Sequence, residues 1–396
     1  MKTLRVNPAA IFSTVHVPGS KSYANRVLIL AALNPGAFTI HDLPDSSDVT
    51  LLADALKSIG LQLTSQGRSL TILNSFPACE SSGKTVEVGE GGTTARFLAS
   101  MLLLGKQPYN LVLGSRLKER PWQEFIEFVK AHGGHAELND AKLSLQGPLS
   151  LPAKIEIDCS RTTQFASGIC MAFANQGIEV APVNMTSSQS YWDMTQELIK
   201  IPVSWNSFHI PLDWSSASYP LAFAALNHPV FFPGLYPDKY QSDSKFHDLL
   251  KSFEALESRK DGIQVTPIRN HKAVVMDASD CLDLVPALAF FLSHIKGTHE
   301  LTGIGNLVFK ESDRLSEIRK LLEVFNRQTG VRGGSLYIEG HTSKLSHEIN
   351  LTLPDDHRMV MAGTLFLRHH MGGLIGPSEA VNKSYPGYFN LFPDCI

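Results

Sequence analysis

Stretches rich in alanine and leucine recur along the chain at intervals of about 70 residues, with one shorter step near the middle. They are apolar nearly all round, and most open on a small or polar residue, so we expect them to form buried helices. They cover residues 20–33, 92–104, 162–174, 215–226, 282–292 and 356–369. This recurrence indicates an assembly of repeated units, and about six such units would fill the chain.

A second class of helix alternates with the first and is amphipathic and charged, which predicts helices that cover a surface. These helices are expected at 47–59, 122–132, 192–201, 244–253 and 312–325. Short runs of β-type residues predict strands at 109–113, 154–157, 208–211, 273–276 and 349–353. The repeated unit is therefore strand, helix, strand, helix with extra strands, and it predicts an α/β architecture with two multi-unit lobes. Residues 211–214 are the candidate crossover.

Size and charge exclude several classes of protein. The chain has 396 residues, whereas a single hydrophobic core stops growing at roughly 250 to 300 residues, so we expect two or more domains. Its 35 lysines and arginines against 38 aspartates and glutamates argue against nucleic-acid or membrane-surface binding. The cysteines are odd in number without a CxxC pair, and the histidines lack a convincing ligand set, so we expect no disulfide framework and no metal. With no apolar run of about 18 residues, we expect a cytoplasmic protein with no membrane partner.

The run from Lys310 to Arg314 places two cations and two carboxylates at the start of a predicted helix. A helix N-terminus attracts anions, so this run is a plausible phosphate or carboxylate site, and Glu311 beside it could exchange protons. In the alternative interpretation, Ser312 only caps the helix, and Glu311 and Asp313 complement its dipole. The sequence of this run alone favours neither.

Further segments combine cations or glycines with small polar groups, mostly at predicted loop-to-helix junctions. They are residues 18–22, 89–94, 118–121, 356–358 and 383–386. The first is not a P-loop because the required spacing is absent, and any single segment is most simply a turn or a solvated surface. Together they suit a cleft that binds two substrates with several phosphates and carboxylates.

In their order and type, these segments resemble the 5-enolpyruvylshikimate-3-phosphate synthase family from residue 18 to residue 386. The KESDR and DHR motifs carry most of the specificity. The resemblance implies two lobes, each of three βαβαββ units, an inside-out α/β barrel. One lobe would be 19–212 and the other 1–18 plus 213–396, with the chain crossing twice and the lobes closing over substrate.

The resemblance also implies the reaction and its residues. Phosphoenolpyruvate would donate its enolpyruvyl group to the 5-hydroxyl of shikimate 3-phosphate, without cofactor or metal, in a protein expected to be a monomer. The implied phosphoenolpyruvate ligands are Lys21, Gly92, Arg120, Arg314, Arg358 and Lys383. The implied shikimate 3-phosphate ligands are Ser22, Arg26, Thr162, Thr163, Gln164, Ser188, Tyr191, Asp283, Asn306 and Lys310. Among the catalytic residues Asp283, Glu311 and Lys21, Asp283 would deprotonate the hydroxyl and Glu311 would exchange the methylene proton.

Several positions depart from the family pattern. Glu90 stands where the family has Asn, and it would repel a bound phosphate unless it is paired or protonated. Val308 replaces a common Arg, Thr162-Thr163 replaces Ser-Ser, and the segment from Ser188 lacks Lys-Pro. Glu90, Val308 and the Ser188 segment support a divergent enolpyruvyl transferase with another hydroxylated acceptor. The altered loop around Glu90 also bears on the glyphosate sensitivity that the resemblance implies.

Two more classes of protein fit the residues less well. A UDP-N-acetylglucosamine enolpyruvyl transferase would share the fold and the donor, but Ser22, Arg26 and the KESDR run argue against it. A non-catalytic anion-binding relative is disfavoured by Asp283 and Glu311.

Overall fold

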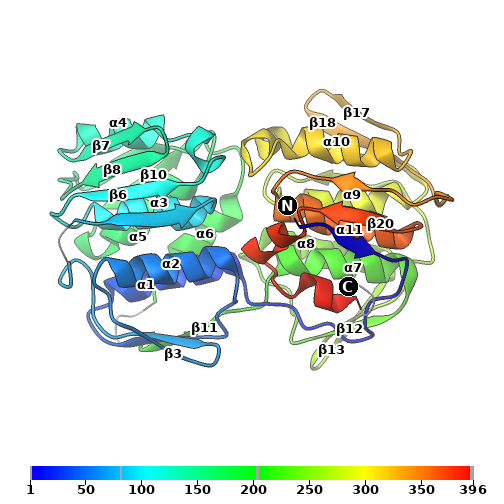
Figure 1. Ribbon diagram of the computed structural model, residues 1–396, viewed down its shortest axis with the longest axis horizontal. Helices are drawn as coiled ribbons and strands as arrows, with labels where there is room; N and C mark the ends of the chain where they lie inside the picture. The colour runs from blue at the N-terminus through cyan, green and yellow to red at the C-terminus, as the bar shows by residue number, and fades with distance from the viewer. Residues whose placement is uncertain (1, 81–82, 202–204, 393–396) are drawn as a thin grey trace. The chain divides into compact units, whose positions relative to one another are not determined.

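The computed structural model describes residues 2–80, 83–201 and 205–392 (Figure 1). The chain divides into two compact units, Gly19–Pro211 and Met1–Pro18 with Leu212–Ile396. We call the first the middle unit and the second the terminal unit. The chain leaves the terminal unit after Pro18 and returns to it at Leu212.

Buried helices form the centre of the middle unit. Helices α1 (Lys21–Leu33), α3 (Gly92–Leu102) and α5 (Gln164–Phe173) pack against one another. Nearly every residue of α3 and α5 is buried, which explains why these segments are rich in small and apolar residues. The amphipathic helices are α2 (Ser47–Ser58), α4 (Gln123–Ala131) and α6 (Gln189–Leu198).

The sheets of the middle unit are made of short strands. One sheet has the order β5-β6-β8-β7, a second β11-β2-β4-β3, and β9 pairs with β10. The strand bounds are β2 Phe38–His41, β3 Leu63–Gln66, β4 Ser69–Ile72, β5 Thr85–Gly89, β6 Tyr109–Leu113, β7 His135–Asn139, β8 Lys142–Gln146, β9 Lys154–Asp158, β10 Glu179–Val183 and β11 Ser207–His209. In each four-stranded sheet the first pair is parallel and the others are antiparallel.

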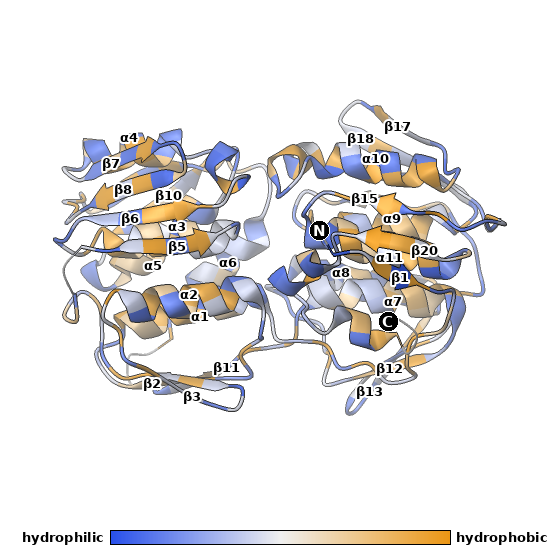
Figure 2. Ribbon diagram, in the orientation of Figure 1, coloured by the Kyte–Doolittle hydropathy of each residue, from blue (hydrophilic) through white to orange (hydrophobic). Residues whose placement is uncertain are grey.

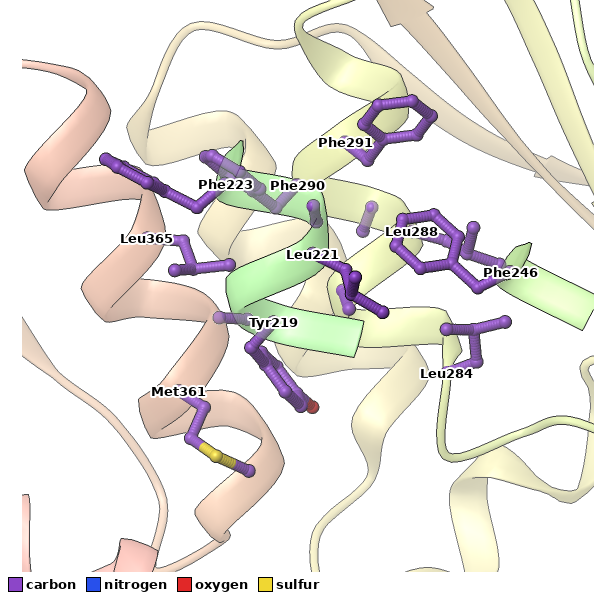
Figure 3. Close-up of a cluster of buried hydrophobic side chains, with 14 of the residues drawn as sticks. Tyr219, Leu221, Phe223, Phe246, Leu284, Leu288, Phe290, Phe291, Met361 and Leu365 are labelled. Atoms are coloured by element: carbon purple, nitrogen blue, oxygen red, sulfur yellow. The ribbon is translucent and has the colours of Figure 1, made fainter. Parts of the chain in front are cut away.

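The terminal unit repeats this plan. Its buried helices are α7 (Trp214–Asn227), α9 (Val285–Ser293) and α11 (His357–His369), and its amphipathic helices are α8 (Lys245–Ser252) and α10 (Arg314–Val324). In Figure 2, α9 is coloured hydrophobic almost throughout, whereas α10 mixes both colours. The side chains of α7, α9 and α11 meet in one core, shown in Figure 3. There Phe290 of α9 lies 6.4 Å from Phe223 of α7 and 5.3 Å from Phe366 of α11, measured between ring centroids.

The sheets of the terminal unit show the repeat most clearly. The order β15-β16-β18-β17 is that of β5-β6-β8-β7, again with a parallel first pair. The other sheets have the orders β12-β14-β13 and β1-β20-β19. The strand bounds are β1 Leu4–Val6, β12 Val230–Pro233, β13 Leu256–Arg259, β14 Gly262–Val265, β15 Val275–Asp277, β16 Gly297–Thr302, β17 Thr329–Arg332, β18 Ser335–Gly340, β19 Leu351–Thr352 and β20 Gly373–Gly376.

Short 3₁₀ helices connect several of these elements. They are η1 Leu117–Glu119, η2 Ala174–Gln176, η3 Ser242–Ser244, η4 Gly305–Phe309, η5 Ser378–Lys383 and η6 Tyr388–Leu391. Within the described ranges, no helix is long and apolar enough to cross a membrane.

The predicted helices are confirmed, all with ends within three residues of the expected ones. Helix α6 begins three residues earlier than predicted because Ser188, at φ 64°, turns the chain just before Gln189. The five predicted strands are also present, although β19 is shorter than expected. The sequence pattern did not locate the remaining strands.

Candidate active site

In the terminal unit a buried arginine joins the starts of two helices. Arg314 begins α10, and its Nε and Nη2 donate to the carboxylate of Asp356 at 2.8 and 3.1 Å. Asp356 is the N-cap of α11 and also accepts from Ser312 Oγ at 2.9 Å. Arg314 is 2% exposed and Asp356 is fully buried. Because buried charges are costly unless paired, this contact fixes the two helix starts to each other.

Asp283 lies among cations on the loop before α9. Its Oδ1 is 2.6 Å from Arg314 Nη1 and 3.2 Å from Lys310 Nζ, and its Oδ2 is 3.6 Å from Arg358 Nη2. Arg358 is buried, and within the described part of the chain its Nε and Nη1 have no hydrogen-bond partner. Unsatisfied guanidinium donors of this kind favour an anionic ligand.

The pKa values of this cluster follow from the pairing. Burial alone would lower the pKa of Arg314, but the Asp356 and Asp283 carboxylates outweigh burial and raise the pKa well above its usual value. Burial would likewise raise the pKa of Asp356, but Arg314 outweighs it and lowers that pKa. Both groups are therefore held in their charged forms at neutral pH.

Glu311 has a separate set of partners. Its Oε2 lies 2.9 Å from His357 Nδ1 and 3.7 Å from Lys383 Nζ. Lys383, at the end of η5, also donates to the backbone oxygen of Asp355 at 2.8 Å. The Glu311 side chain is 12% exposed. A carboxylate next to an imidazole and an ammonium, with limited access to solvent, is suited to proton exchange.

Glu311, Asp356 and His357 offer possible metal-ligand atoms within 4.8 Å of one another. Asp356, however, is already bonded to Arg314, and Lys383 lies beside Glu311. A metal ion would have to displace these cations or sit next to them. The charges therefore favour an anion at this place.

In the middle unit Lys21 begins α1 and forms a partly buried ion pair. Its Nζ lies 2.9 Å from Oδ2 of Asp48 in α2. Asp48 is 2% exposed, so Lys21 is the cation that pairs with a buried side chain here. On the next turn, Asn25 Nδ2 donates to Thr93 Oγ1 at 2.7 Å, which ties α1 to the start of α3.

Arg26 is buried in α1, where its guanidinium donates to neutral oxygens. It donates to Thr195 Oγ1 at 2.8 Å and to the backbone oxygens of Ser22 and Tyr191 at 2.9 and 3.0 Å. Its guanidinium also lies 5.1 Å from the ring centroid of Phe97 and 5.7 Å from that of Tyr191. Burial lowers the pKa of Arg26 to about 10, so it remains charged at neutral pH.

The starts of α3 and α5 meet around Gly92. A Cβ atom there would lie 2.6 Å from Arg120 Nη1 and 2.9 Å from Gln164 Oε1, so only glycine permits this approach. Arg96 Nη1 donates to Gln164 Oε1 at 2.6 Å, and its Nη2 donates to the Pro121 oxygen at 3.0 Å. Since the Gln164 oxygen accepts from Arg96, its amide nitrogen is the end left to donate elsewhere.

Over residues 6–392 the chain matches the family described as EPSP synthase (3-phosphoshikimate 1-carboxyvinyltransferase). The chain belongs to the EPSP synthase family. A 3-phosphoshikimate 1-carboxyvinyltransferase of Caldivirga maquilingensis is 26% identical to it over 96% of this chain and 95% of the relative. EPSP synthase from Acinetobacter baumannii has a TM-score of 0.78 at 20% identity, covering 99% of this chain and 97% of that one. The enolpyruvyl transferase NikO from Streptomyces tendae has a TM-score of 0.75 at 13% identity, covering 98% and 96%.

The comparisons confirm the predicted fold class, the two-lobed enolpyruvyl transferase fold. Membership of the EPSP synthase family also supports enolpyruvyl transfer in the shikimate pathway as the activity of this chain. The chain is therefore placed among the transferases.

The residues that the family resemblance implies fall into two groups, one in each unit. The middle unit holds Lys21, Ser22, Arg26, Gly92, Arg120, Thr162, Thr163, Gln164, Ser188 and Tyr191. The terminal unit holds Asp283, Asn306, Lys310, Glu311, Arg314, Arg358 and Lys383. Within the terminal unit, Asp283 contacts Lys310, Arg314 and Arg358, and Glu311 contacts Lys383. In the middle unit the Thr162 hydroxyl accepts from the backbone N–H of Gln164 at 3.3 Å, at the start of α5.

Sequence reasoning missed several charged residues of these clusters. It assigned no role to Asp48, to Arg96, or to Asp356 as the partner of Arg314. It also missed Asp243, a fully buried carboxyl that accepts from Ser215 and whose Oδ1 has no partner within the described part of the chain. Burial, and then the nearby Asp283 charge, raise the pKa of Asp243 to about 7. Only Asp356 carried a sequence signal, since an Asp directly before a helix is a common N-cap.

Proposed function

We propose that this chain transfers the enolpyruvyl group of phosphoenolpyruvate to the 5-hydroxyl of shikimate 3-phosphate through the residues of these two clusters. The supporting observation is the placement of Asp283 and Glu311 in one cluster with four cations. Three of these cations lie next to Asp283 and the fourth lies next to Glu311. Two carboxylates in different surroundings suit a reaction in which one proton leaves a hydroxyl and another joins and leaves a carbon.

Asp283 is the proposed base for the acceptor hydroxyl. In the structure three cations lie within 3.6 Å of its carboxylate and hold it in position. Phosphate and carboxylate oxygens of the donor would compete for Arg314 and Arg358, and among the described residues the buried Nε and Nη1 of Arg358 have no hydrogen-bond partner. Donor binding would thereby loosen the hold of the arginines on Asp283 and leave its carboxylate available to accept the hydroxyl proton.

Glu311 is the proposed group that protonates the donor methylene. The protonated carboxyl gives its proton to the methylene carbon, and the neighbouring carbon becomes cationic and is attacked by the hydroxyl oxygen. From the resulting tetrahedral intermediate, the Glu311 carboxylate takes back a methyl proton as the C–O bond to phosphate breaks. His357 and Lys383 hold the carboxylate in place through both steps.

The middle unit supplies further substrate contacts in this proposal. Lys21 and Arg120 bind donor oxygens, and Gly92 admits the close approach. Gln164 presents its amide nitrogen to the acceptor because Arg96 occupies its oxygen. Arg26, which donates three hydrogen bonds within the unit, positions Ser22 and Tyr191 in this proposal.

The proposal is tested by incubating the purified protein with phosphoenolpyruvate and shikimate 3-phosphate and following both phosphate release and the enol-ether product. We expect Asp283→Asn and Glu311→Gln to lower kcat by about 10² to 10⁴, the usual loss for a missing acid or base, with smaller effects on KM. Glu323→Gln, on the exposed side of α10, is the matched control and should be fully active. Near-normal turnover of either active-site variant would remove that residue from its role.

A different acceptor is the second candidate function. It is favoured by Val308 and by the Ser188 segment, where the chain departs from the family pattern. The discriminating result is phosphate release from phosphoenolpyruvate that requires another hydroxylated cyclic acid and does not occur with shikimate 3-phosphate. Release with shikimate 3-phosphate at low concentration excludes this second function.

A further inference from the structure

Glu90 is the acidic residue that replaces the family's usual Asn in the glycine-rich segment before α3. From sequence, its charge was expected to repel a bound phosphate unless paired. In the structure the carboxylate is paired: Oε2 accepts from the Leu117 amide at 2.9 Å, and Oε1 accepts from the Arg116 amide at 3.3 Å and from Ser115 Oγ at 3.2 Å. These donors all belong to one segment, the loop after β6 and the start of η1.

That segment leads directly to Arg120. The Leu117 carbonyl accepts from the Arg120 amide at 3.2 Å and from Trp122 Nε1 at 3.0 Å. Leu117 is fully buried, and the packing of its side chain holds this turn in place. Glu90 therefore holds Leu117 through its N–H, and Leu117 holds Arg120 and Trp122 through its C=O.

The segment that carries Glu90 also lies beside the Arg120 guanidinium. Glu90 lies two residues before Gly92, the glycine whose missing side chain leaves room for the Arg120 guanidinium. A carboxylate has two oxygens that accept from backbone N–H groups with charge assistance, so it is a stronger clamp than an amide. An Asn at this position would be one methylene shorter and would have one acceptor oxygen.

We propose that Glu90 is a positioning residue that clamps the 115–117 turn and so fixes the Arg120 guanidinium over Gly92 for binding of the anionic donor. The inference rests on the proposed function, in which Arg120 contacts phosphoenolpyruvate. It assigns this chain a stronger clamp than the family's usual Asn, and it places the charge of Glu90 against backbone amides.

Gly114 offers an independent way to disturb the clamp. A Cβ atom there would lie 2.3 Å from the Glu90 carboxyl carbon. Gly114 does not have a positive φ, so alanine fits the backbone and the flexible carboxylate is what must move. Gly114→Ala should therefore push Glu90 off the turn while leaving its charge in the protein.

The test measures kcat and KM for each substrate, together with amide hydrogen exchange of residues 114–122, in Glu90→Ala, Glu90→Gln, Gly114→Ala and the Glu90→Ala/Gly114→Ala double variant. Since a displacement of about 1 Å can cost about 100-fold, we expect KM for phosphoenolpyruvate to rise by about tenfold or more in Glu90→Ala. KM for shikimate 3-phosphate should change by less than about twofold, a change worth under about 0.4 kcal/mol and within ordinary non-additivity. Glu90→Gln should fall between Glu90→Ala and wild type.

The double variant is the most specific arm. If Gly114→Ala acts by displacing Glu90, the double variant should be no worse than Glu90→Ala alone, because the clash is gone with the carboxylate. Additive losses would show that Gly114→Ala acts in another way. Glu87→Gln, an exposed glutamate of β5, is the control for loss of a negative charge near α3 and should match wild type in all measurements.

Hydrogen exchange separates failure of this inference from failure of the proposed function. The Arg116 and Leu117 amides should exchange faster in Glu90→Ala than in wild type, whatever the substrates are. Unchanged exchange, or an equal rise in both KM values with a lower Tm, would overturn the inference. If the wild-type protein does not turn over these substrates, the donor role falls with the proposed function, and exchange alone decides the clamp.

Discussion

Replacing Asp356 by alanine tests how the terminal unit holds its charges. The carboxylate accepts from Arg314 Nε and Nη2, from Ser312 Oγ, and from the Arg358 amide at 3.0 Å. The change leaves Arg314 buried with Asp283 as a remaining carboxylate contact, and it removes the N-cap of α11. The perturbation therefore combines an unpaired buried charge with a lost helix cap.

The magnitude follows from these contacts. Removing one partner of a buried ion pair costs about 3 to 5 kcal/mol, and losing an N-cap costs about 1 kcal/mol. Because Asp283 remains 2.6 Å from Arg314 and compensates part of its charge, we expect a net loss of about 3 kcal/mol in the free energy of unfolding. For a unit of this size that loss corresponds to a fall in Tm of roughly 6 to 12 °C.

Calorimetry of wild type, Asp356→Ala and Asp356→Asn measures this loss. The Asn variant keeps an acceptor for the helix cap but loses the charge, so its Tm should lie between the other two. Glu323→Ala, which removes an exposed charge from α10, should shift the unfolding free energy by less than about 0.5 kcal/mol. If Asp356→Ala unfolds at the wild-type temperature, the ion pair does not stabilise the unit and the reasoning is wrong.

Three further changes have outcomes that follow from burial. Burial raises the pKa of Asp243 to about 7, so the folded state keeps a proton that the unfolded chain loses above about pH 4. The stability of the wild-type protein therefore falls as pH rises from about 4 to 7. The Tm advantage of Asp243→Asn over wild type should grow from pH 5 to pH 8. Burial lowers the pKa of His369 to about 3, so the free energy of unfolding falls by up to about 1.4 kcal/mol per pH unit as pH drops below 6.5. The Tm of His369→Leu should therefore depend less on pH between 7 and 5 than the Tm of the wild-type protein. Arg96→Lys removes the planar guanidinium that donates to both Gln164 and Pro121, so KM for shikimate 3-phosphate should rise by about tenfold. An unchanged KM would show that Gln164 does not need Arg96 as a partner.

Helices were more predictable from sequence than strands for a physical reason. The stretches that became α3 and α9 are apolar nearly throughout, so their existence and approximate ends follow from local residues. Strands such as β3 and β17 are four residues long and largely exposed, and they are specified by pairing across a hairpin. Local pattern alone carries too little information for elements of that kind.

The candidate site shows the same division. Lys310, Arg314 and Arg358 stood out because cations at helix starts form recognisable motifs. Their pairing did not, because Arg314 reaches Asp356 across 42 residues and Lys21 reaches Asp48 across 27. Such contacts depend on how helices pack. Glu90 is the sharpest case, since its sequence suggested repulsion of a phosphate and its hydrogen bonds show a backbone clamp.

In the proposed reaction the donor methylene is protonated and then deprotonated on the way to product. Running the reaction in D₂O and following deuterium at the methylene carbon of the enol-ether product, by NMR or mass spectrometry, detects both steps. Addition and elimination through Glu311 predicts deuterium at that carbon in the wild-type product and a sharply reduced rate of incorporation in Glu311→Gln. A product formed at the normal rate without deuterium would contradict the account, because the enolpyruvyl group would then have been transferred with its methylene intact.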